Sequence, residues 1–423
     1  MTCINCKSSN LNKIVNLNKQ PISSLFYEKT KKNLKLYPLD LYECEKCNLV
    51  QLIKLAPLKN MYGNTYGYRT SLSRLMIDHM KDKFSMILNK KIINKINENI
   101  LDIGSNDGTF LNFFAKKSFK CLYGIDPSAE KFINNYNNKI RVGVDFFSKN
   151  KVENFFGKKK FKLITSFAMF YDIADPNSFC KDIYDLLDKN GIWILELSYL
   201  PTLIENLTYD QICHEHIAYY TLTVFKKVIE RSNLRIIDFR LNEINGGSIE
   251  IICAKKEANL KQKKKINKQL DLELKINKTT YKNLNIRINN TANNLIEFLN
   301  LLKKSKKKVI GYGASTKGNI LLNQIKANSH LISFIADANP EKNGKFTPGT
   351  NIKIITKEKM RKIKPDYLLV LIWSFRKEVI KQEKDYIMKG GKLIFPLPII
   401  HFIDKSNFKK YLNSDFSSYS NKI

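Results

Sequence analysis

The feature that most constrains the fold of this chain is an alternation of short apolar segments with amphipathic ones, which runs through two long regions. The first region, residues 100–254, opens with the apolar run Ile100–Ile103 and a glycine-containing turn. The second region, residues 308–394, shows the same kind of pattern without repeating the sequence. Alternating strands and helices form parallel sheets whose two faces are covered by helices. We therefore predict an α/β protein with two Rossmann-like domains.

Cysteine spacing indicates a metal site before the first α/β region. Four of the eight cysteines form two Cys-x2-Cys pairs, Cys3 with Cys6 and Cys44 with Cys47. Each pair points two thiolates at one ion, and two pairs supply the closed tetrahedral ligand set of a structural Zn²⁺ site. The other four cysteines stand alone, which argues against a secreted disulfide framework. Four cysteines that are merely buried or coincidental are the alternative to a zinc site.

The composition of the segments predicts where the domains begin and end in the 423-residue chain. The region between the cysteine pairs contains prolines and few helix signals, so we expect a loop and short strands around the metal. A Lys- and Asn-rich stretch after the first α/β region has apolar residues three and four apart, which predicts one or two long helices. The predicted parts are a zinc-binding domain (1–58), an aromatic loop with a connecting helix (59–90), the first α/β domain (91–256), linking helices (257–303), the second Rossmann-like domain (304–411) and a tail (412–423).

The net charge of +33 raises nucleic acid or anionic lipid as a partner. Lys and Asn are spread over nearly every surface-like segment, however, and the basic residues do not gather in one block with aromatic residues. We therefore expect a generally basic, solvated surface with no specific nucleic-acid site. No apolar run approaches the roughly 18–20 residues that span a bilayer, and the start of the chain lacks a signal-peptide pattern. A soluble, cytoplasmic protein without membrane attachment is expected.

The turn after the first predicted strand reads Asp102-x-Gly104-x-x-x-Gly108, which resembles the glycine loop of class I methyltransferases that use S-adenosylmethionine. The glycines allow a sharp turn and a close approach of the next helix. Asp126 ends the following strand, where it is placed to accept both ribose hydroxyls, and the segment at Asp145 is expected to flank an adenine. The predicted cofactor-binding residues are Asp102, Gly104, Ser105, Asn106, Gly108, Asp126, Asp145, Phe146 and Phe147.

Two of the five histidines lie in the segment His214-Glu215-His216. The spacing is not His-Glu-x-x-His, so it does not indicate a catalytic zinc site. A histidine with a pKa near the working pH, beside a carboxylate, suits proton abstraction from carbon. A polar loop whose histidines are satisfied by the backbone is the alternative.

Several further motifs occur in a characteristic order. They are Cys3-x2-Cys6 with Cys44-x2-Cys47, Tyr66-x-Tyr68-x-x-Ser71, the glycine loop at 101–108, Gly124-Ile-Asp-Pro-Ser128, Cys213-His-Glu-His216 with Tyr219, Asn245-Gly-Gly-Ser248, Gly311-Tyr-Gly-Ala-Ser-Thr-Lys-Gly318, Asp337-x-Asn-Pro340 with Pro348-Gly349, and Pro396-Leu-Pro398. In this order the chain resembles the sugar C-methyltransferases of nucleotide-sugar pathways, which methylate a 4-keto-hexose nucleotide at C3.

The resemblance implies a zinc-binding domain, a central methyltransferase domain and a C-terminal domain that helps to hold the nucleotide sugar. It places the base at His216, with Glu215 beside it and Tyr66 or Tyr68 facing the sugar; His214 is kept as the alternative base. The chain departs from the family pattern at Tyr171-Asp172, where many members have a histidine, and at Glu250, where an arginine is common.

The turn that opens the second α/β region is expected to bind a diphosphate through its backbone N–H groups and Lys317. A rigid packing turn with a solvated lysine is the alternative. Asp337, after the next strand, is expected to bind a ribose or to form a turn. The predicted substrate-binding residues are Tyr171, Asn245, Gly246, Gly313, Lys317 and Asp337.

Together these features predict a C-methyltransferase that uses S-adenosylmethionine and acts at C3 of a nucleotide-linked 4-keto-hexose. A C–H bond next to a ketone is acidic because the carbanion is delocalised as an enolate, and we expect His216 to remove that proton. The expected partner is a nucleotide sugar, dTDP-linked, bound by a monomer. The alternatives are O- or N-methylation of a sugar or another small molecule, and a zinc-ribbon protein that binds nucleic acid.

Overall fold

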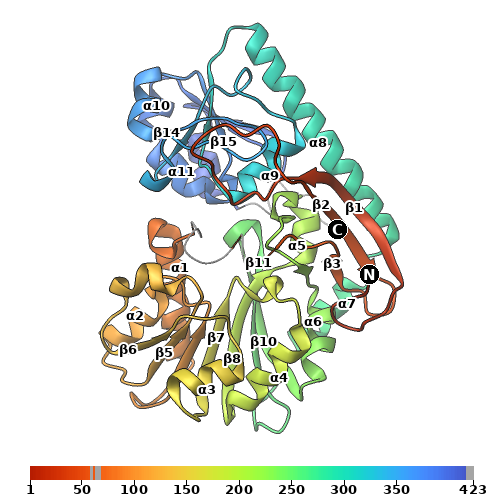
Figure 1. Cartoon of the computed structure of the whole chain (residues 1–423), viewed down its shortest axis with the longest axis vertical. Helices are drawn as coiled ribbons and strands as arrows, with labels where there is room; N and C mark the ends of the chain where they lie inside the picture. Colours follow the sequence, from red (N-terminus) through yellow and green to blue (C-terminus); the bar gives the residue numbers. More distant parts are fainter. Residues whose placement is uncertain (58–60, 62–67, 416–423) are drawn as a thin grey trace.

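The computed structural model describes residues 1–57, 61 and 68–415, and it contains three β-sheets within this part of the chain (Figure 1). The N-terminal sheet is antiparallel, in the order β1-β2-β3-β9. Its last strand comes from the middle of the chain and pairs Ala218 with Gln51. The two-residue strand β9 therefore ties the His-Glu-His segment directly to the cysteine-containing region. The strands are β1 (Leu11–Gln20), β2 (Tyr37–Cys44), β3 (Val50–Leu52) and β9 (Ala218–Tyr219).

The central sheet has seven strands in the order β10-β11-β8-β7-β4-β5-β6. The five strands from β6 to β8 are parallel, and β11 is inserted antiparallel between β8 and β10. The strands are β4 (Ile100–Ile103), β5 (Leu122–Ile125), β6 (Ile140–Gly143), β7 (Phe161–Phe167), β8 (Leu187–Ser198), β10 (Leu234–Asn242) and β11 (Ser248–Lys255). The helices that accompany it are α1 (Arg74–Asn89), α2 (Thr109–Lys116), α3 (Lys149–Phe156), α4 (Pro176–Leu186), α5 (Leu200–Glu205) and α6 (Leu222–Glu230).

The C-terminal sheet has six strands in the order β14-β13-β12-β15-β16-β17, all parallel except the last. The strands are β12 (Val309–Tyr312), β13 (Ile335–Asp337), β14 (Ile354–Thr356), β15 (Tyr367–Val370), β16 (Lys392–Phe395) and β17 (His401–Ile403). The helices are α9 (Thr316–Gln324), α10 (Lys357–Ile363), α11 (Arg376–Gln382), α12 (Lys384–Met388) and α13 (Phe408–Asn413). The prediction of a doubly wound α/β fold with a separate N-terminal module is confirmed.

Two helices link the α/β domains, α7 (Lys265–Glu273) and α8 (Lys278–Lys304). The first half of α8 packs against the N-terminal sheet through Tyr281 and Ile288, and its second half packs against the C-terminal sheet through Leu295 and Leu299. In Figure 1 this helix runs along the N-terminal sheet and on toward the C-terminal domain. One continuous apolar face of α8 therefore braces two sheets against each other.

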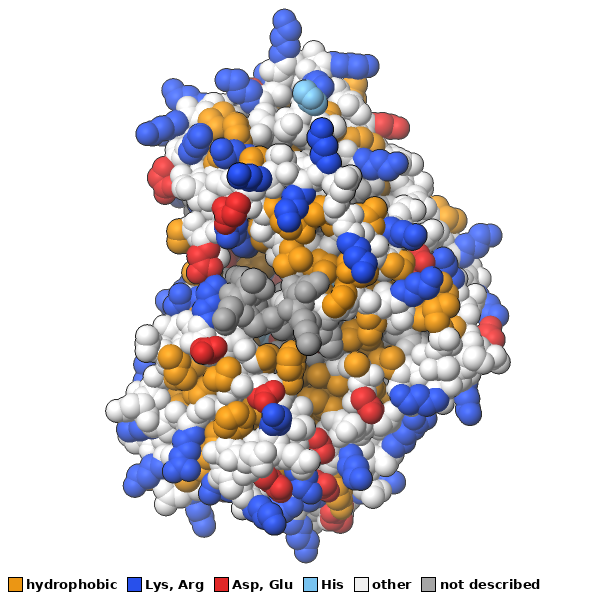
Figure 2. Space-filling model, viewed as in Figure 1, with side chains coloured by type: hydrophobic (Ala, Val, Ile, Leu, Met, Phe, Trp, Pro, Cys, Tyr) orange, Lys and Arg blue, Asp and Glu red, His pale blue; other side chains and the backbone are white. Residues whose placement is uncertain are grey.

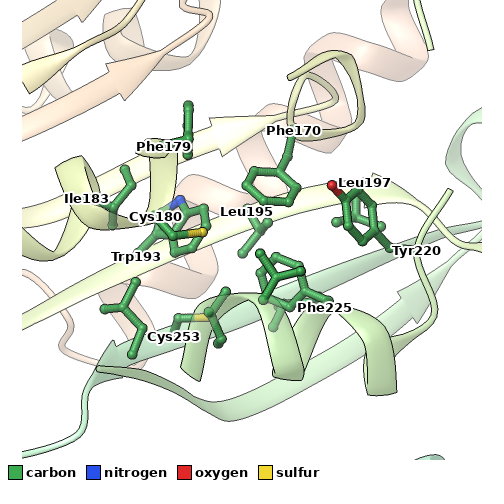
Figure 3. Close-up of a cluster of buried hydrophobic side chains, with 14 of the residues drawn as sticks. Phe170, Phe179, Cys180, Ile183, Trp193, Leu195, Leu197, Tyr220, Phe225 and Cys253 are labelled. Atoms are coloured by element: carbon green, nitrogen blue, oxygen red, sulfur yellow. The ribbon is translucent and has the colours of Figure 1, made fainter. Parts of the chain in front are cut away.

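An aromatic core packs against the central sheet around the fully buried Trp193, whose indole N–H donates to Ser166 Oγ over 2.9 Å (Figure 3). The ring of Phe170 lies 5.3 Å from the ring of Tyr220 and 5.4 Å from the ring of Phe225, measured between centroids. Because Phe170 and Tyr220 pack on each other, the two chain segments that carry Tyr171 and His216 are fixed relative to one another.

The surface is basic without a concentrated patch on the face shown in Figure 2, where Lys and Arg side chains are spread over both halves of the molecule. No helix among the described residues has the length and apolar character needed to cross a membrane.

Candidate active site

Four cysteines come together where two turns of the N-terminal module meet. The Sγ atoms of Cys3, Cys6, Cys44 and Cys47 all lie within 4.8 Å of one another, and none of them forms a disulfide. Cys3 Sγ is 3.6 Å from Cys47 Sγ, and Cys6 Sγ is 3.5 Å from Cys44 Sγ. A tetrahedral zinc site with bonds of about 2.3 Å requires sulfur–sulfur distances of about 3.8 Å. The four thiols therefore fit Zn²⁺ in a closed structural site that leaves no position for a substrate.

A cavity of about 290 Å³ opens where β4, β5 and β7 end. The carboxyl ends of parallel strands are the usual ligand site of such sheets. Seven of the nine predicted cofactor residues line the cavity, together with Thr70, Met76, Met80, Phe167 and Met169. The seven are Asp102, Gly104, Ser105, Asn106, Asp126, Phe146 and Phe147. Its size and its mixture of apolar and polar walls fit S-adenosylmethionine.

The glycine loop has the conformation that its sequence predicts. Gly104 and Gly108 adopt φ angles of +73° and +75°, which residues with a side chain rarely do. A Cβ atom on Gly108 would lie 2.7 Å from the ring of Tyr136, whose hydroxyl donates to the carbonyl of Asn106 over 2.7 Å. Gly108 does not line the cavity: it makes room for the tyrosine that holds the loop in place.

Three carboxylates predicted to bind the cofactor have different surroundings. Asp126 lies in the cavity wall and accepts hydrogen bonds from the backbone N–H groups of Asn106 and Ser128. Asp102 accepts from Thr165 Oγ1 over 2.6 Å, and burial raises its pKa to about 7. Asp145 was expected at the adenine, but it lies outside the cavity and forms an ion pair with Lys151 at 2.6 Å. The neighbouring phenylalanines line the cavity in its place.

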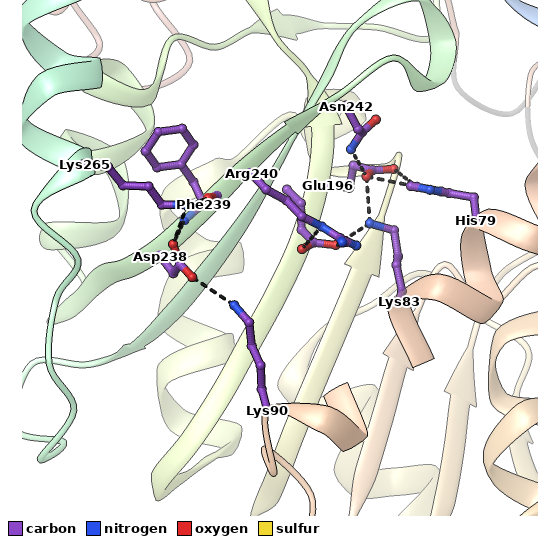
Figure 4. Close-up of polar contacts among 10 residues, drawn as sticks. His79, Lys83, Lys90, Glu196, Asp238, Phe239, Arg240, Asn242 and Lys265 are labelled. Atoms are coloured by element: carbon purple, nitrogen blue, oxygen red, sulfur yellow. Dashed lines mark hydrogen bonds and ion pairs between the residues drawn. The ribbon is translucent and has the colours of Figure 1, made fainter. Parts of the chain in front are cut away.

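A buried network of charges reaches the cavity through Glu196, a residue that the sequence analysis did not single out (Figure 4). Glu196 accepts from His79 Nε2 at 2.9 Å and from Lys83 Nζ at 2.7 Å, and Lys83 Nζ also lies 2.6 Å from Glu250. Arg240 completes the pairing of Glu250. The sequence does contain a signal of this network: Glu196 and Glu250 lie within largely apolar strands. A carboxylate is buried there only with charged partners.

The His-Glu-His segment sends its side chains to different places. His214 is buried against the ring of Tyr37 in the N-terminal module, at 6.0 Å between ring centroids, and burial lowers its pKa to about 4. Glu215 is also buried, and burial raises its pKa. Among the described residues, no hydrogen bond or ion pair joins either side chain to His216. Glu215 was expected to be the partner of His216, but a different group orients the imidazole.

That group is the backbone carbonyl of Gln211, which lies 2.7 Å from His216 Nδ1. A carbonyl only accepts, so Nδ1 carries the proton and Nε2 keeps its lone pair. The imidazole packs on the ring of Tyr171, with 4.3 Å between centroids. Burial and then the positive charge of Lys317 lower its pKa to about 3, so the imidazole is neutral at pH 7.

A single 3-10 turn, η4 (Phe170–Asp172), contacts His216 on one side and the cofactor cavity on the other. Asp172 lines the cavity, while the preceding Tyr171 contacts His216 and accepts from the N–H of Ile217 over 2.9 Å. Of the two tyrosines expected to face the sugar, Tyr66 lies outside the described residues. Tyr68 lines the cavity, 45% exposed, and its carbonyl accepts from Asn106.

The C-terminal domain reaches the same region through the turn after β12. Gly313 has a φ of +89°, and a Cβ atom there would lie 2.6 Å from Ile372. Asp337 accepts from the N–H of Ala314 over 2.6 Å, so it fixes the turn from the end of β13. Lys317 Nζ extends to Asn245, 3.2 Å from its Oδ1.

A second contact between the domains lies at Gly246, which adopts a φ of +89°. A Cβ atom on Gly246 would lie 2.6 Å from the ring of Trp373, so only glycine lets the two domains approach this closely. The Trp373 indole N–H donates to Asp210 Oδ2 over 2.7 Å. Gly246 is thus part of an interdomain contact, beside Asn245.

Comparison with known proteins agrees with this three-part arrangement. Three family models match consecutive stretches: a "putative zinc binding domain" over residues 3–62, a methyltransferase domain over 72–238 and a C-methyltransferase C-terminal domain over 243–398. C-methyltransferase NovU of Streptomyces niveus is 27% identical over 367 residues, which cover 86% of this chain and 87% of that protein. The chain is therefore similar to this C-methyltransferase over most of its length. It is a methyltransferase that uses S-adenosylmethionine and has a zinc-binding domain.

Two other similar proteins match a smaller part of the chain. A tRNA U34 carboxymethyltransferase of Sulfurimonas denitrificans is 29% identical over 171 residues, 36% of this chain and 54% of that protein. The structure of magnesium protoporphyrin IX methyltransferase from Synechocystis PCC 6803 with bound SAH is 12% identical and aligns with 47% of this chain and 92% of its own, with a TM-score of 0.33.

Proposed function

We propose that this C-methyltransferase methylates C3 of a nucleotide-linked 4-keto-hexose, and that the reaction passes through an enolate. The observation that carries the proposal is the state and place of His216. Its imidazole is neutral and has a free lone pair on Nε2, and it packs on Tyr171 of the η4 turn, whose Asp172 lines the cofactor cavity. Transfer to carbon needs a base that removes a proton from carbon, and a neutral histidine can serve as that base.

In the proposed reaction, His216 Nε2 takes the C3 proton and the electron pair of the broken C–H bond moves onto the O4 oxygen. The imidazolium is stabilised by the anion that forms beside it, which offsets the low pKa of His216 in the free protein. S-adenosylmethionine supplies an electrophilic methyl group. The residues of the cavity wall, with Asp126 and the glycine loop foremost, hold the donor so that C3 and the methyl carbon meet in line.

The nucleotide portion of the substrate is assigned to the C-terminal domain. The Gly313 turn leads into the start of α9, and Asp337 lies beside the turn at the end of the parallel strand β13. This is the position at which nucleotides bind in doubly wound sheets. We propose a dTDP-linked sugar as the substrate to be tested first.

The test is exchange of the C3 proton for deuterium in heavy water, with a dTDP-4-keto-hexose and without methyl donor. The wild type should exchange, because enolisation precedes methyl transfer. His216→Asn should lose both exchange and methylation and should keep its affinity for S-adenosylmethionine, since asparagine takes up no proton at neutral pH. The exposed His330 provides the control variant His330→Asn, which should exchange like the wild type.

Two results would contradict the proposal. Undiminished exchange in His216→Asn would show that another group is the base. No exchange in the wild type, combined with transfer of methyl to oxygen or nitrogen, would make the protein an O- or N-methyltransferase.

A further inference from the structure

Lys317 belongs to the C-terminal domain, yet its ammonium lies at the predicted catalytic base of the central domain. The residue sits in the first turn of α9, after the N-cap Ser315, whose Oγ accepts from the N–H of Gly318 over 2.9 Å. Its Nζ is 3.2 Å from Oδ1 and 3.5 Å from the carbonyl oxygen of Asn245, 72 residues away in sequence. The charge is near enough to His216 to lower the pKa of the imidazole.

Hydrogen bonds through two residues, Asn245 and Gln211, connect Lys317 to His216. The carbonyl of Asn245 accepts from Lys317 and also from Gln211 Nε2, over 3.0 Å. The carbonyl of Gln211 accepts from His216 Nδ1 and from the hydroxyl of Tyr219. The ammonium and the imidazole are thus positioned by the same two residues, so their spacing is set by the fold.

The positive charge of Lys317 lies on a partly buried side chain without a close counter-ion. In the part of the chain that the structure describes, its ammonium forms no ion pair, and its hydrogen-bond partner is a neutral amide. The carboxylate that acts on it electrostatically is Asp210, whose Oδ2 accepts from Trp373. Burial lowers the pKa of Lys317 and raises that of Asp210. A partly buried cation held by neutral partners is suited to an anion that appears only during the reaction.

We propose that the Lys317 ammonium donates a hydrogen bond to the substrate oxygen that becomes negative when His216 removes the neighbouring C–H proton. This inference rests on the proposed function, and it makes Lys317 a catalytic residue that crosses between domains. The C–H electron pair moves onto the carbonyl oxygen, where Lys317 stabilises it, and the proton goes to His216 Nε2. When the carbon forms its bond to the methyl group, the bond between methyl and sulfur breaks and its electron pair stays on the sulfur of the donor. The oxygen returns to a carbonyl, and Lys317 keeps its proton.

A role in binding the diphosphate of the substrate is the competing assignment for Lys317. The two roles differ in what the residue stabilises. A phosphate contact acts equally on bound substrate and transition state, so its loss would raise KM. An enolate contact acts on the transition state alone, so its loss would lower kcat.

The experiment compares Lys317→Met and Lys317→Arg with wild type in deuterium exchange at C3 without methyl donor. Calorimetry with dTDP and with S-adenosylmethionine is run in parallel, so that binding is measured separately from exchange. Lys317→Met should lower the maximal exchange rate by ~10²–10³-fold, the effect of losing one donor to an oxyanion, while dTDP affinity changes less than about threefold. Lys317→Arg keeps the charge and should recover part of the rate. The control is Lys326→Met, which removes an exposed charge just after the same helix.

A second measurement distinguishes chemistry from folding. Because Lys317 lowers the pKa of His216, its removal should raise that pKa, so the acidic limb of the exchange profile should move to higher pH. The groups that set the His216 pKa in the structure are its buried surroundings, Lys317 and the Gln211 carbonyl. Circular dichroism at each pH shows the range over which the variant stays folded, so that the shift is read apart from acid unfolding.

The inference is overturned if Lys317→Met exchanges at the wild-type maximal rate while its dTDP affinity falls, because the lysine would then bind phosphate. It is also overturned if the acidic limb stays in place in a folded variant. If the wild type itself does not exchange, the proposed function fails first, and that outcome is recognisable without any Lys317 variant.

Discussion

Asp126 shows how the fold prepares one side chain for a ligand. Its Oδ1 accepts from both the backbone N–H and the hydroxyl of Ser128, each at 2.6 Å, and its Oδ2 accepts from the N–H of Asn106 at 2.9 Å. These bonds fix the carboxylate in the cavity wall at the end of β5. A fixed acceptor loses little conformational entropy when it binds ribose hydroxyls.

Replacing Asp126 by alanine should weaken S-adenosylmethionine binding by about 1–3 kcal/mol, because a charged hydrogen-bond acceptor is lost. Asp145→Ala is the matched control: its carboxylate pairs with Lys151 outside the cavity, so the variant should bind like the wild type. Calorimetry measures both. Equal affinities in wild type and Asp126→Ala would show that the ribose lies elsewhere, and a larger loss in Asp145→Ala would restore the original assignment of that residue.

At the scale of elements, strands were easier to predict than short helices. The apolar runs at 100–103 and 309–312 are strands because four consecutive buried residues suit a sheet covered on both faces. The sequence predicts a helix over residues 129–136, whereas the structure has the 3-10 segment Ala129–Asn135 there; α3 was not predicted. α3 buries only Val152 and Phe156, so its apolar pattern is too sparse to detect.

The zinc site is an element-scale prediction, because one metal ion would join two turns that are far apart in the sequence. Purified protein should contain about one Zn²⁺ per chain, and Cys44→Ser should lower both the metal content and the Tm, since metal binding stabilises only the folded module. Cys121→Ser removes a cysteine outside the cluster and should change the zinc content little. Metal analysis measures the zinc content of the wild type and of both variants, and thermal unfolding measures their Tm. Full stability of a zinc-free Cys44→Ser protein would refute a structural role for the metal.

At the scale of the whole molecule, the candidate site forms where three sheets meet. His214 packs into the N-terminal module, His216 faces the η4 turn of the central domain, and Lys317 arrives from the C-terminal domain. The sequence predicted the residue types and the three domains. It did not predict which histidine turns which way, because the segment has no regular period from which orientation follows. The contact between Lys317 and Asn245 depends on how two domains dock, which no local pattern encodes.

The central claim is that the protein adds methyl to carbon, and the most direct measurement is the position of the transferred group. The wild type is incubated with a dTDP-4-keto-hexose and S-adenosylmethionine carrying a ¹³C-labelled methyl group, and the product is examined by NMR. The account predicts that the label is attached to C3, seen as a long-range correlation between the labelled methyl protons and the C4 carbonyl carbon, and that His216→Asn forms no such product. A label attached to oxygen or nitrogen would contradict the account.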